Sequence, residues 1–104
     1  FVMSEPRAKT VEEVRDEFLD YIHGIARYWA TLPDKTPQEM CDGLAFSILV
    51  VFDGGTLPLP ALDITLAPHP DDKQYHIDQD ENWYEPGMVI NDDCMLHEEF
   101  VQHD

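Results

Sequence analysis

Basic residues are scarce in this chain and almost absent from its second half. The 104 residues contain six Lys and Arg against 22 Asp and Glu, which gives a formal net charge of −16. Residues 53–104 hold thirteen carboxylates and a single cation, Lys73, so this half contributes −12. Such a charge repels nucleic acid and anionic membranes, and we exclude direct binding to either. The charge favours a basic protein surface, a cation, or no partner at all.

Long apolar runs and cysteine frameworks are also missing. The longest apolar block, residues 44–52, contains Ser47 and is far shorter than the ~20 residues needed to span a bilayer. Two cysteines, Cys41 and Cys94, have no metal-ligand spacing, so we expect two reduced thiols, with a Cys41–Cys94 bridge or a reactive thiol as the alternatives. Reduced thiols and the lack of a signal-peptide pattern predict a cytoplasmic protein.

The length and the 43% apolar content are typical of one folded domain covering residues 1–104. We expect residues 1–9 to form a flexible N-terminal tail. Phe1 and Val2 precede Met3 and are expected to be cloning remnants, with Met3 as the native start.

Two capping boxes predict where helices begin in the first half. Thr10 is followed three residues later by Glu13, and Thr36 is followed by Glu39, so each hydroxyl and carboxylate can satisfy the free amides of a helix start. After Thr10, apolar residues recur at steps of three and four and form one stripe. The stripe consists of Val11, Val14, Phe18, Ile22, Ile25, Trp29 and Leu32.

The stripe predicts a helix over 11–32 that Pro33 ends, and the second capping box predicts a helix that runs to Phe52 and ends at glycine. The short connection makes the two helices antiparallel. The second helix is apolar nearly all round from Leu44, so we expect it to be central and covered on several sides. If the stripe packs on this helix, the protein is a monomer or at most a weak homodimer. The alternative is an oligomeric structural protein that pairs through the stripe.

The second half carries strand signals. An extended linker over 56–60 is followed by alternating apolar and polar residues over 61–67, which predict a half-buried strand. Further strands are expected over 74–78, 83–84 and 88–90, and Asn91 or Asp92 is expected to cap a short last helix. The predicted fold class is therefore α+β: an antiparallel two-helix N-terminal half packed on a small antiparallel sheet, with a short C-terminal helix.

One turn carries a possible metal motif. Residues 67–73 read Ala-Pro-His-Pro-Asp-Asp-Lys and resemble the His-Pro-Asp-Asp-Glu motif of the LmbE-like zinc deacetylases. That resemblance implies His69 and Asp72 as zinc ligands and Asp71 as the general base, although Lys73 replaces the final acid. His76 is a further candidate ligand. The alternative is a proline-rigidified turn with solvated Asp71 and Asp72 at its tip.

Carboxylates and aromatic residues supply candidates for partner binding. On the first helix, Glu12, Asp16 and Asp20 form one column at i, i+4 and i+8, beside the column of Glu13 and Glu17. A rigid carboxylate array of this kind can imitate a phosphate backbone; a solvated helix face is the alternative. The second set of candidates is Asp78, Asp80, Glu81, Trp83 and Tyr84. Its two aromatics suit either an interface anchor or the lid of a small core.

Residues 43–55 and 60–68, continuing into 69–72 and 81–84, look like small uncharacterised bacterial and bacteriophage proteins. The resemblance implies a phage or mobile-element context and carries no catalytic residue. We therefore predict a non-enzymatic acidic protein without a cofactor that engages a basic protein, as a nucleic-acid-mimicking inhibitor. The alternative is a small metal-binding module or metal-dependent hydrolase that uses His69, Asp71, Asp72 and His76.

Overall fold

The structure, a computed structural model, describes residues 5–56 and 59–103. These residues form four helices: α1 (Val11–Ala30), α2 (Pro37–Phe52), α3 (Asp72–Asp78) and α4 (Leu96–Gln102). The described ranges contain no sheet, and their only β pairing is an isolated antiparallel bridge between Thr65 and Val89. The fold class is therefore all-α, and the prediction of an α+β fold is wrong. The helices in these ranges are too short or too polar to cross a membrane.

Contacts between residues divide the chain into two compact units, residues 1–48 and residues 49–104. The predicted cloning remnants at positions 1 and 2, the first residues of the tail, and residues 57 and 58 of the predicted linker lie outside the described residues. The prediction of a single domain stays a prediction.

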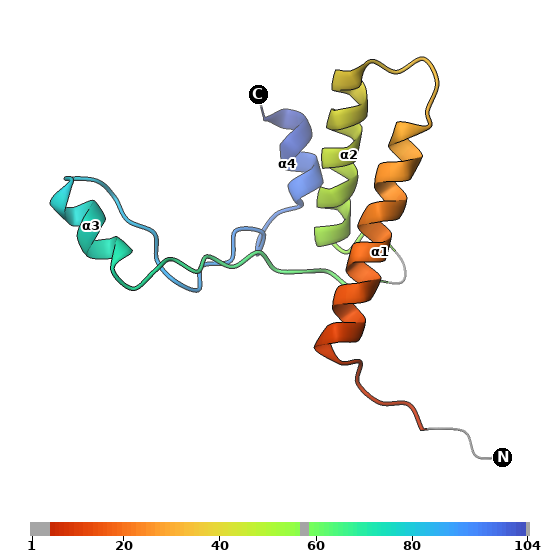
Figure 1. Cartoon of the computed structure of the whole chain (residues 1–104). Helices are drawn as coiled ribbons and strands as arrows, with labels where there is room; N and C mark the ends of the chain where they lie inside the picture. The colour runs from red at the N-terminus through yellow and green to blue at the C-terminus, as the bar shows by residue number, and fades with distance from the viewer. Residues whose placement is uncertain (1–4, 57–58, 104) are drawn as a thin grey trace. The chain divides into compact units, whose positions relative to one another are not determined.

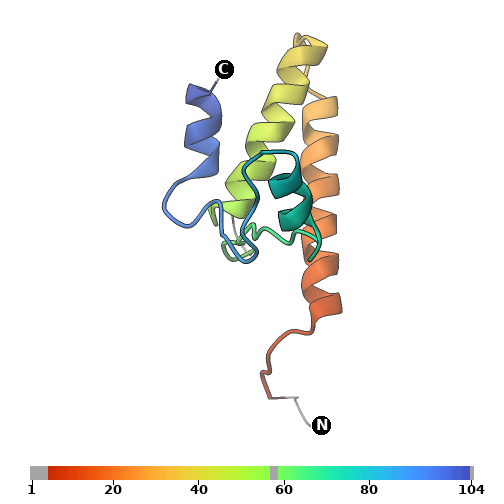
Figure 2. The same ribbon diagram turned by 90° about the vertical axis from the view of Figure 1, so that its left-hand side faces the viewer.

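In the first unit, α1 and the main part of α2 run antiparallel, side by side (Figures 1 and 2). Both predicted capping boxes are confirmed. The Thr10 hydroxyl accepts from the Glu13 amide at 3.2 Å, and the Glu13 carboxylate accepts from the Thr10 amide at 2.9 Å. Thr36 and Glu39 make the same pair of bonds at 3.1 and 3.0 Å. These bonds satisfy amide groups that have no partner inside the helix.

Trp29 joins the two helices of this unit. Its indole Nε1 donates to the Ser47 hydroxyl at 2.9 Å, and its ring packs where Gly43 leaves room, one turn earlier on α2. A Cβ built on Gly43 would overlap three atoms of the ring. The absence of a side chain at Gly43 therefore permits the close approach of α1 and α2.

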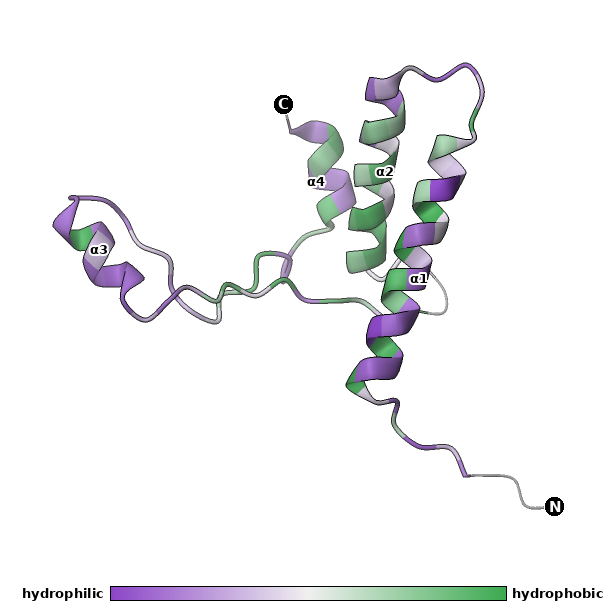
Figure 3. Cartoon of the chain, viewed as in Figure 1, coloured by the Kyte–Doolittle hydropathy of each residue, from purple (hydrophilic) through white to green (hydrophobic). Residues whose placement is uncertain are grey.

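The apolar core of the described residues is thin. Val51 and Leu59 are the only buried hydrophobic residues there, at 0% and 3% exposure. The predicted stripe is half-buried, except that Val11 is 67% exposed. Its last residue, Leu32, lies beyond the end of α1, which is shorter than the predicted helix over 11–32. Figure 3 shows that α2 is the most hydrophobic helix, but its residues 44–50 are only half-buried. This helix is therefore less fully covered than we predicted.

The C-terminal end of α2 follows the predicted glycine signal. Gly54 has φ +79°, its amide donates to the Val51 carbonyl, and the Gly55 amide donates to the Val50 carbonyl at 3.0 Å. This pair of bonds is a Schellman motif, which satisfies the last carbonyls of the helix. The chain then turns back, and the Leu62 amide donates to the Phe52 carbonyl at 2.9 Å.

In the second unit, residues 62–66 pair with residues 87–91 over only a few hydrogen bonds. The Leu66 amide donates to Met88 at 2.8 Å, and the Ile90 amide donates to Ile64 at 3.0 Å. The pairing is too short to form strands, so the strands predicted over 61–67 and 88–90 are not formed. Residues 83–84, predicted as another strand, have no regular structure.

Helix α3 occupies residues 72–78, where alternation predicted a strand. Local side-chain bonds favour the helix: the Asp72 carboxylate accepts from the His69 amide at 3.1 Å, and Gln74 donates to Asp78, four residues later, at 2.8 Å. Tyr75 and Ile77, whose alternation suggested a half-buried strand, are 61% and 44% exposed.

The packing of Trp29 makes a paired test of the first unit. We expect Gly43→Ala to destabilise the chain by about 1–3 kcal/mol, because the new methyl group forces the ring of Trp29 away. Gly24→Ala in the interior of α1 is the control. Nothing lies within 4 Å of a Cβ at Gly24, so this change should stabilise by about 0.5–1 kcal/mol. Urea denaturation followed by circular dichroism measures both; equal effects would contradict the packing role of Gly43.

Candidate functional site

Asp53, directly after α2, holds the beginning of α4. One carboxylate oxygen accepts from the Leu96 amide at 2.9 Å, and the other accepts from the His97 amide at 2.8 Å. The second oxygen also lies 2.5 Å from Nδ1 of His97. Because a carboxylate can only accept, this ring nitrogen carries the proton. The Asp53 side chain is 1% exposed.

This arrangement corrects the predicted cap of the last helix. Neither Asn91 nor Asp92 caps it; Met95 stands at the N-cap and makes no side-chain bond to the helix. Asp53, more than forty residues earlier in the chain, supplies the acceptor instead. Burial by itself would raise the pKa of Asp53, but the amides of His97 and Leu96 and the His97 ring outweigh it and hold this pKa below its ordinary value.

Asn91 fixes the chain before α4. Its amide nitrogen donates to the Leu62 carbonyl at 2.7 Å, and its amide oxygen accepts from the Ile64 amide at 2.9 Å. The side chain thus takes the place of a backbone partner where the short pairing of residues 62–66 ends. Asn91 and Asp53 together position residues 91–97, the segment that leads into α4.

A hollow of about 740 Å³ lies in the second unit beside this segment. Its apolar lining comes from Phe52, Ala61, Leu62 and Met95. Its acidic lining consists of Asp53, Asp63, Asp92, Asp93, Glu98 and Glu99. We call it the acidic hollow. All of these carboxylates except Asp53 are exposed.

The acidic hollow has no internal counter-charge. Among the residues that the structure describes, no Lys, Arg or His lines it, and none of its five exposed carboxylates forms an ion pair. The single cation of residues 53–104, Lys73, instead lies over the Trp83 ring, 4.8 Å from its centre. The negative charge of the hollow is therefore open to an external cation.

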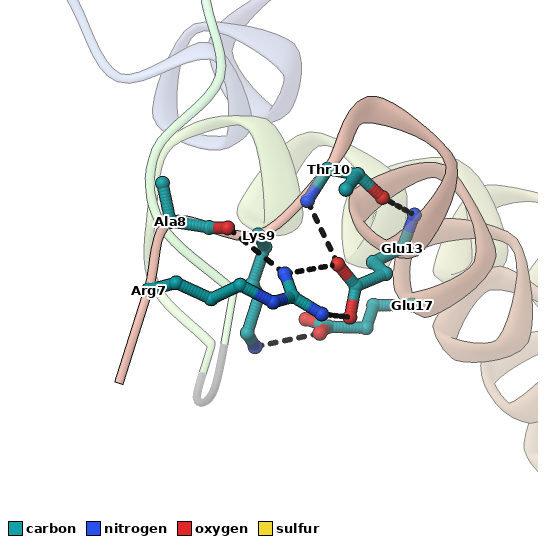
Figure 4. A network of polar contacts seen from close by, with 6 residues as sticks. All are labelled: Arg7, Ala8, Lys9, Thr10, Glu13 and Glu17. Atoms are coloured by element: carbon teal, nitrogen blue, oxygen red, sulfur yellow. Dashed lines mark hydrogen bonds and ion pairs between the residues drawn. The ribbon is translucent and has the colours of Figure 1, made fainter. Parts of the chain in front are cut away.

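The carboxylate columns on α1 are unequal. Glu13 pairs with Arg7 at 2.8 Å, and Glu17 pairs with Lys9 at 2.6 Å (Figure 4). The bonds from Arg7 and Thr10 lower the pKa of Glu13 to about 2. This column is thus neutralised by the segment before α1.

The other column is exposed and unpaired. Within the described part of the chain, Glu12, Asp16 and Asp20 have no ion-pair partner. Of the two predicted columns, only this one presents free charge.

The second predicted set surrounds the end of α3. Asp78 accepts from Gln74, Asp80 takes a left-handed backbone with φ 57°, and Glu81 lies 3.4 Å from His76 Nδ1. Trp83 and Tyr84 are 41% and 62% exposed, so they do not form the lid of a core. The Trp83 indole donates to Glu85 at 2.7 Å.

The predicted metal turn is occupied by its own hydrogen bonds. His69 Nδ1 accepts from the Asp71 amide at 3.1 Å, and Asp72 accepts from the His69 amide. His76 contacts Glu81 instead of this turn. In residues 5–56 and 59–103, no three His, Cys, Asp or Glu side chains are grouped so that they could hold a metal ion. No observation favours the deacetylase-like alternative.

The two cysteines are free thiols, Cys41 exposed and Cys94 half-buried. They do not form the bridge that was one alternative. Burial, followed by the charges of Glu99 and Asp93, raises the pKa of Cys94. The thiolate at Cys94 is therefore disfavoured, which argues against a nucleophile there.

Sequence reasoning missed the acidic hollow. Its acids were visible only as the pairs at 92–93 and 98–99 and as Asp63, without a signal that they meet. Comparison of the chain with protein-family models, curated proteins and solved structures finds no match in any of the three. The resemblance to small bacterial and bacteriophage proteins stays a prediction.

Asp53 gives a test of this geometry. We expect Asp53→Asn to lower the free energy of unfolding at pH 7 by about 1.5–3 kcal/mol, because an amide can accept from only one side and its NH₂ group faces an N–H donor. The loss should shrink in acid. A carboxylate with a lowered folded pKa stabilises above its unfolded pKa of about 3.9 and loses this effect as the pH falls through the folded value.

Urea denaturation at about pH 7 and about pH 3 measures the difference between the two proteins. The exposed Asp71→Asn variant is the control and should match the parent at both values. A constant difference between Asp53→Asn and the parent across this range would contradict the role of the carboxylate charge.

Proposed function

We propose that this chain is a non-enzymatic binding protein that engages a basic protein surface through the acidic hollow. The observation that carries the proposal is the set of five exposed carboxylates around the hollow, which no Lys, Arg or His among the described residues lines. Charges of one sign gathered in a concave site attract ligands of the opposite sign.

The lining suits long basic side chains. Lys and Arg place their aliphatic stems along apolar surface while the charged head stays in a polar setting. Phe52, Leu62 and Met95 supply apolar contact, and the carboxylates supply the partner for the head. An Arg guanidinium can in addition bond one carboxylate through two N–H groups.

The proposal extends to nucleic-acid mimicry by α1. Glu12, Asp16 and Asp20 follow one another at about 6 Å along the helix axis, since each helical residue rises about 1.5 Å. The column is exposed and stands on a capped helix, so the three residues follow one another along one side of a regular backbone. A basic surface made to contact phosphates would find a row of anions there, and its nucleic acid would be displaced.

Neutralising the hollow tests the main proposal. The variant Asp92→Asn/Asp93→Asn/Glu98→Gln/Glu99→Gln should bind a fluorescent peptide rich in Arg and Lys about fivefold or more weakly, since each exposed pair contributes roughly 0.2–1 kcal/mol. Fluorescence anisotropy measures the affinity. Raising the salt from about 50 to about 500 mM should weaken binding to the parent chain strongly.

The control removes the same charge elsewhere. Glu5→Gln/Asp34→Asn/Asp42→Asn/Asp71→Asn neutralises four exposed carboxylates that do not line the hollow. It should lose less affinity than the first variant. Equal losses would show that net charge alone attracts the peptide, and binding that is indifferent to salt would refute the electrostatic basis altogether.

Mimicry is tested by competition. The parent chain should displace a labelled DNA duplex from an arginine-rich nucleic-acid-binding peptide. Glu12→Gln/Asp16→Asn/Asp20→Asn should need about threefold or more protein for the same displacement, on the same scale of exposed pairs. Glu5→Gln/Asp34→Asn/Asp42→Asn serves as the matched control. A triple variant on α1 that competes as well as this control would rule the helix out as the mimic.

A further inference from the structure

We infer that residues 91–99 form a strap, pinned at two points, whose attachment through Asp53 is tightened when a basic ligand occupies the acidic hollow. This inference rests on the proposed function and concerns the regulation of the same site. The strap supplies Asp92, Asp93, Glu98 and Glu99, which are four of the five exposed carboxylates of the hollow.

The two pins are buried or half-buried polar side chains. At the first pin, Asn91 bonds both Leu62 and Ile64. At the second pin, Asp53 accepts from Leu96 and His97. Asp53 belongs to the lining of the hollow, but its side chain is 1% exposed and three donors occupy its two oxygens. It therefore cannot serve a ligand directly and acts as a positioning residue.

Helix α4 needs contacts outside itself in order to form. Helix α4 has seven residues, none of them buried, and no cap from its own N-terminal side chains. A helix of this length is not stable alone in water. Between the pins, the described contacts of Cys94 amount to a long bond from its sulfur to the Ile90 carbonyl, 3.9 Å. Loss of the Asp53 pin should therefore loosen the beginning of α4, the helix that carries Glu98 and Glu99 of the hollow.

The negative charge of the strap disfavours its attachment at Asp53. Asp92, Asp93, Glu98 and Glu99 repel one another, and Asp53 and Asp63 add further negative charge to the lining. His97 is the one basic side chain at the pin itself. The effect of Glu99, Asp93 and Asp53 on the neighbouring Cys94 thiol is consistent with a negative potential there.

A cationic ligand removes this repulsion. A ligand that binds better when the strap is attached must, by linkage, favour the attached state by the same factor. The same reasoning predicts that salt tightens the strap in the absence of ligand, because screening weakens repulsion between exposed charges. The strap should thus be loosest in the free protein at low salt.

Hydrogen exchange of the Leu96 and His97 amides, measured by NMR, reports on the pin directly. In the parent chain at about 50 mM salt, a saturating peptide rich in Arg and Lys should slow exchange of both amides by about threefold or more, as should about 500 mM salt without peptide. Neutralising the strap with Asp92→Asn/Asp93→Asn/Glu98→Gln/Glu99→Gln should slow exchange without either addition. The control Glu5→Gln/Asp34→Asn/Asp42→Asn/Asp71→Asn should leave exchange as in the parent.

Asp53→Asn should speed exchange of both amides by about tenfold or more. Because this variant removes the pin and keeps the four carboxylates of the strap, it separates the effect of the pin from the effect of the charges. This variant should bind the peptide more weakly than the parent but still in a salt-dependent way, since the five exposed carboxylates of the hollow remain. If the peptide binds the parent but leaves Leu96 and His97 exchange unchanged, the inference is wrong and the proposed function stands. If anisotropy shows no binding at all, the proposed function fails. If, in addition, salt does not slow exchange of the Leu96 and His97 amides, the inference about the strap fails as well.

Discussion

The second unit depends on one buried carboxylate. Asp53 directly follows α2, precedes the glycine turn, and accepts hydrogen bonds from the first two amides of α4. The cost of burying its charge is offset by three donors, which is the condition for a buried carboxylate to stabilise a fold. Among the described residues, Val51 and Leu59 are the only buried hydrophobic ones. The hydrogen bonds to Asp53 therefore supply stability that a larger apolar core would otherwise give.

Acidic charge in this protein falls into two classes. Some carboxylates are used inside the fold: Glu13 and Glu39 cap helices, and Asp53 holds α4. The others, around the acidic hollow and along one column of α1, have no basic partner within the described ranges. The first class explains local structure, and the second is the basis of the proposed binding of a basic partner. Both classes consist of Asp and Glu, and they differ in whether the carboxylate has a bonding partner inside the fold.

Local signals were read correctly from the sequence, and distant ones were not. The two capping boxes and the glycine end of α2 each depend on residues a few positions apart, so pattern alone predicted them. The cap of α4 comes from Asp53 and could not be found from the residues around position 96. Alternation misled the prediction of a strand at 74–78, because side-chain bonds four residues apart favoured α3. The hollow could not be predicted for the same reason, because Asp63 and the acids at 92–99 are distant in sequence and meet only in the folded chain.

Each unit contains one tryptophan, and the two stand in contrasting surroundings. Trp29 is half-buried, stacks over Gly43 and donates to Ser47, whereas Trp83 is 41% exposed, lies under Lys73 and donates to Glu85. Their fluorescence emission should differ in wavelength and in accessibility to soluble quenchers. A chain that keeps only one indole would therefore carry an intrinsic optical reporter for one unit alone, so that melting of residues 1–48 and of residues 49–104 could be followed separately.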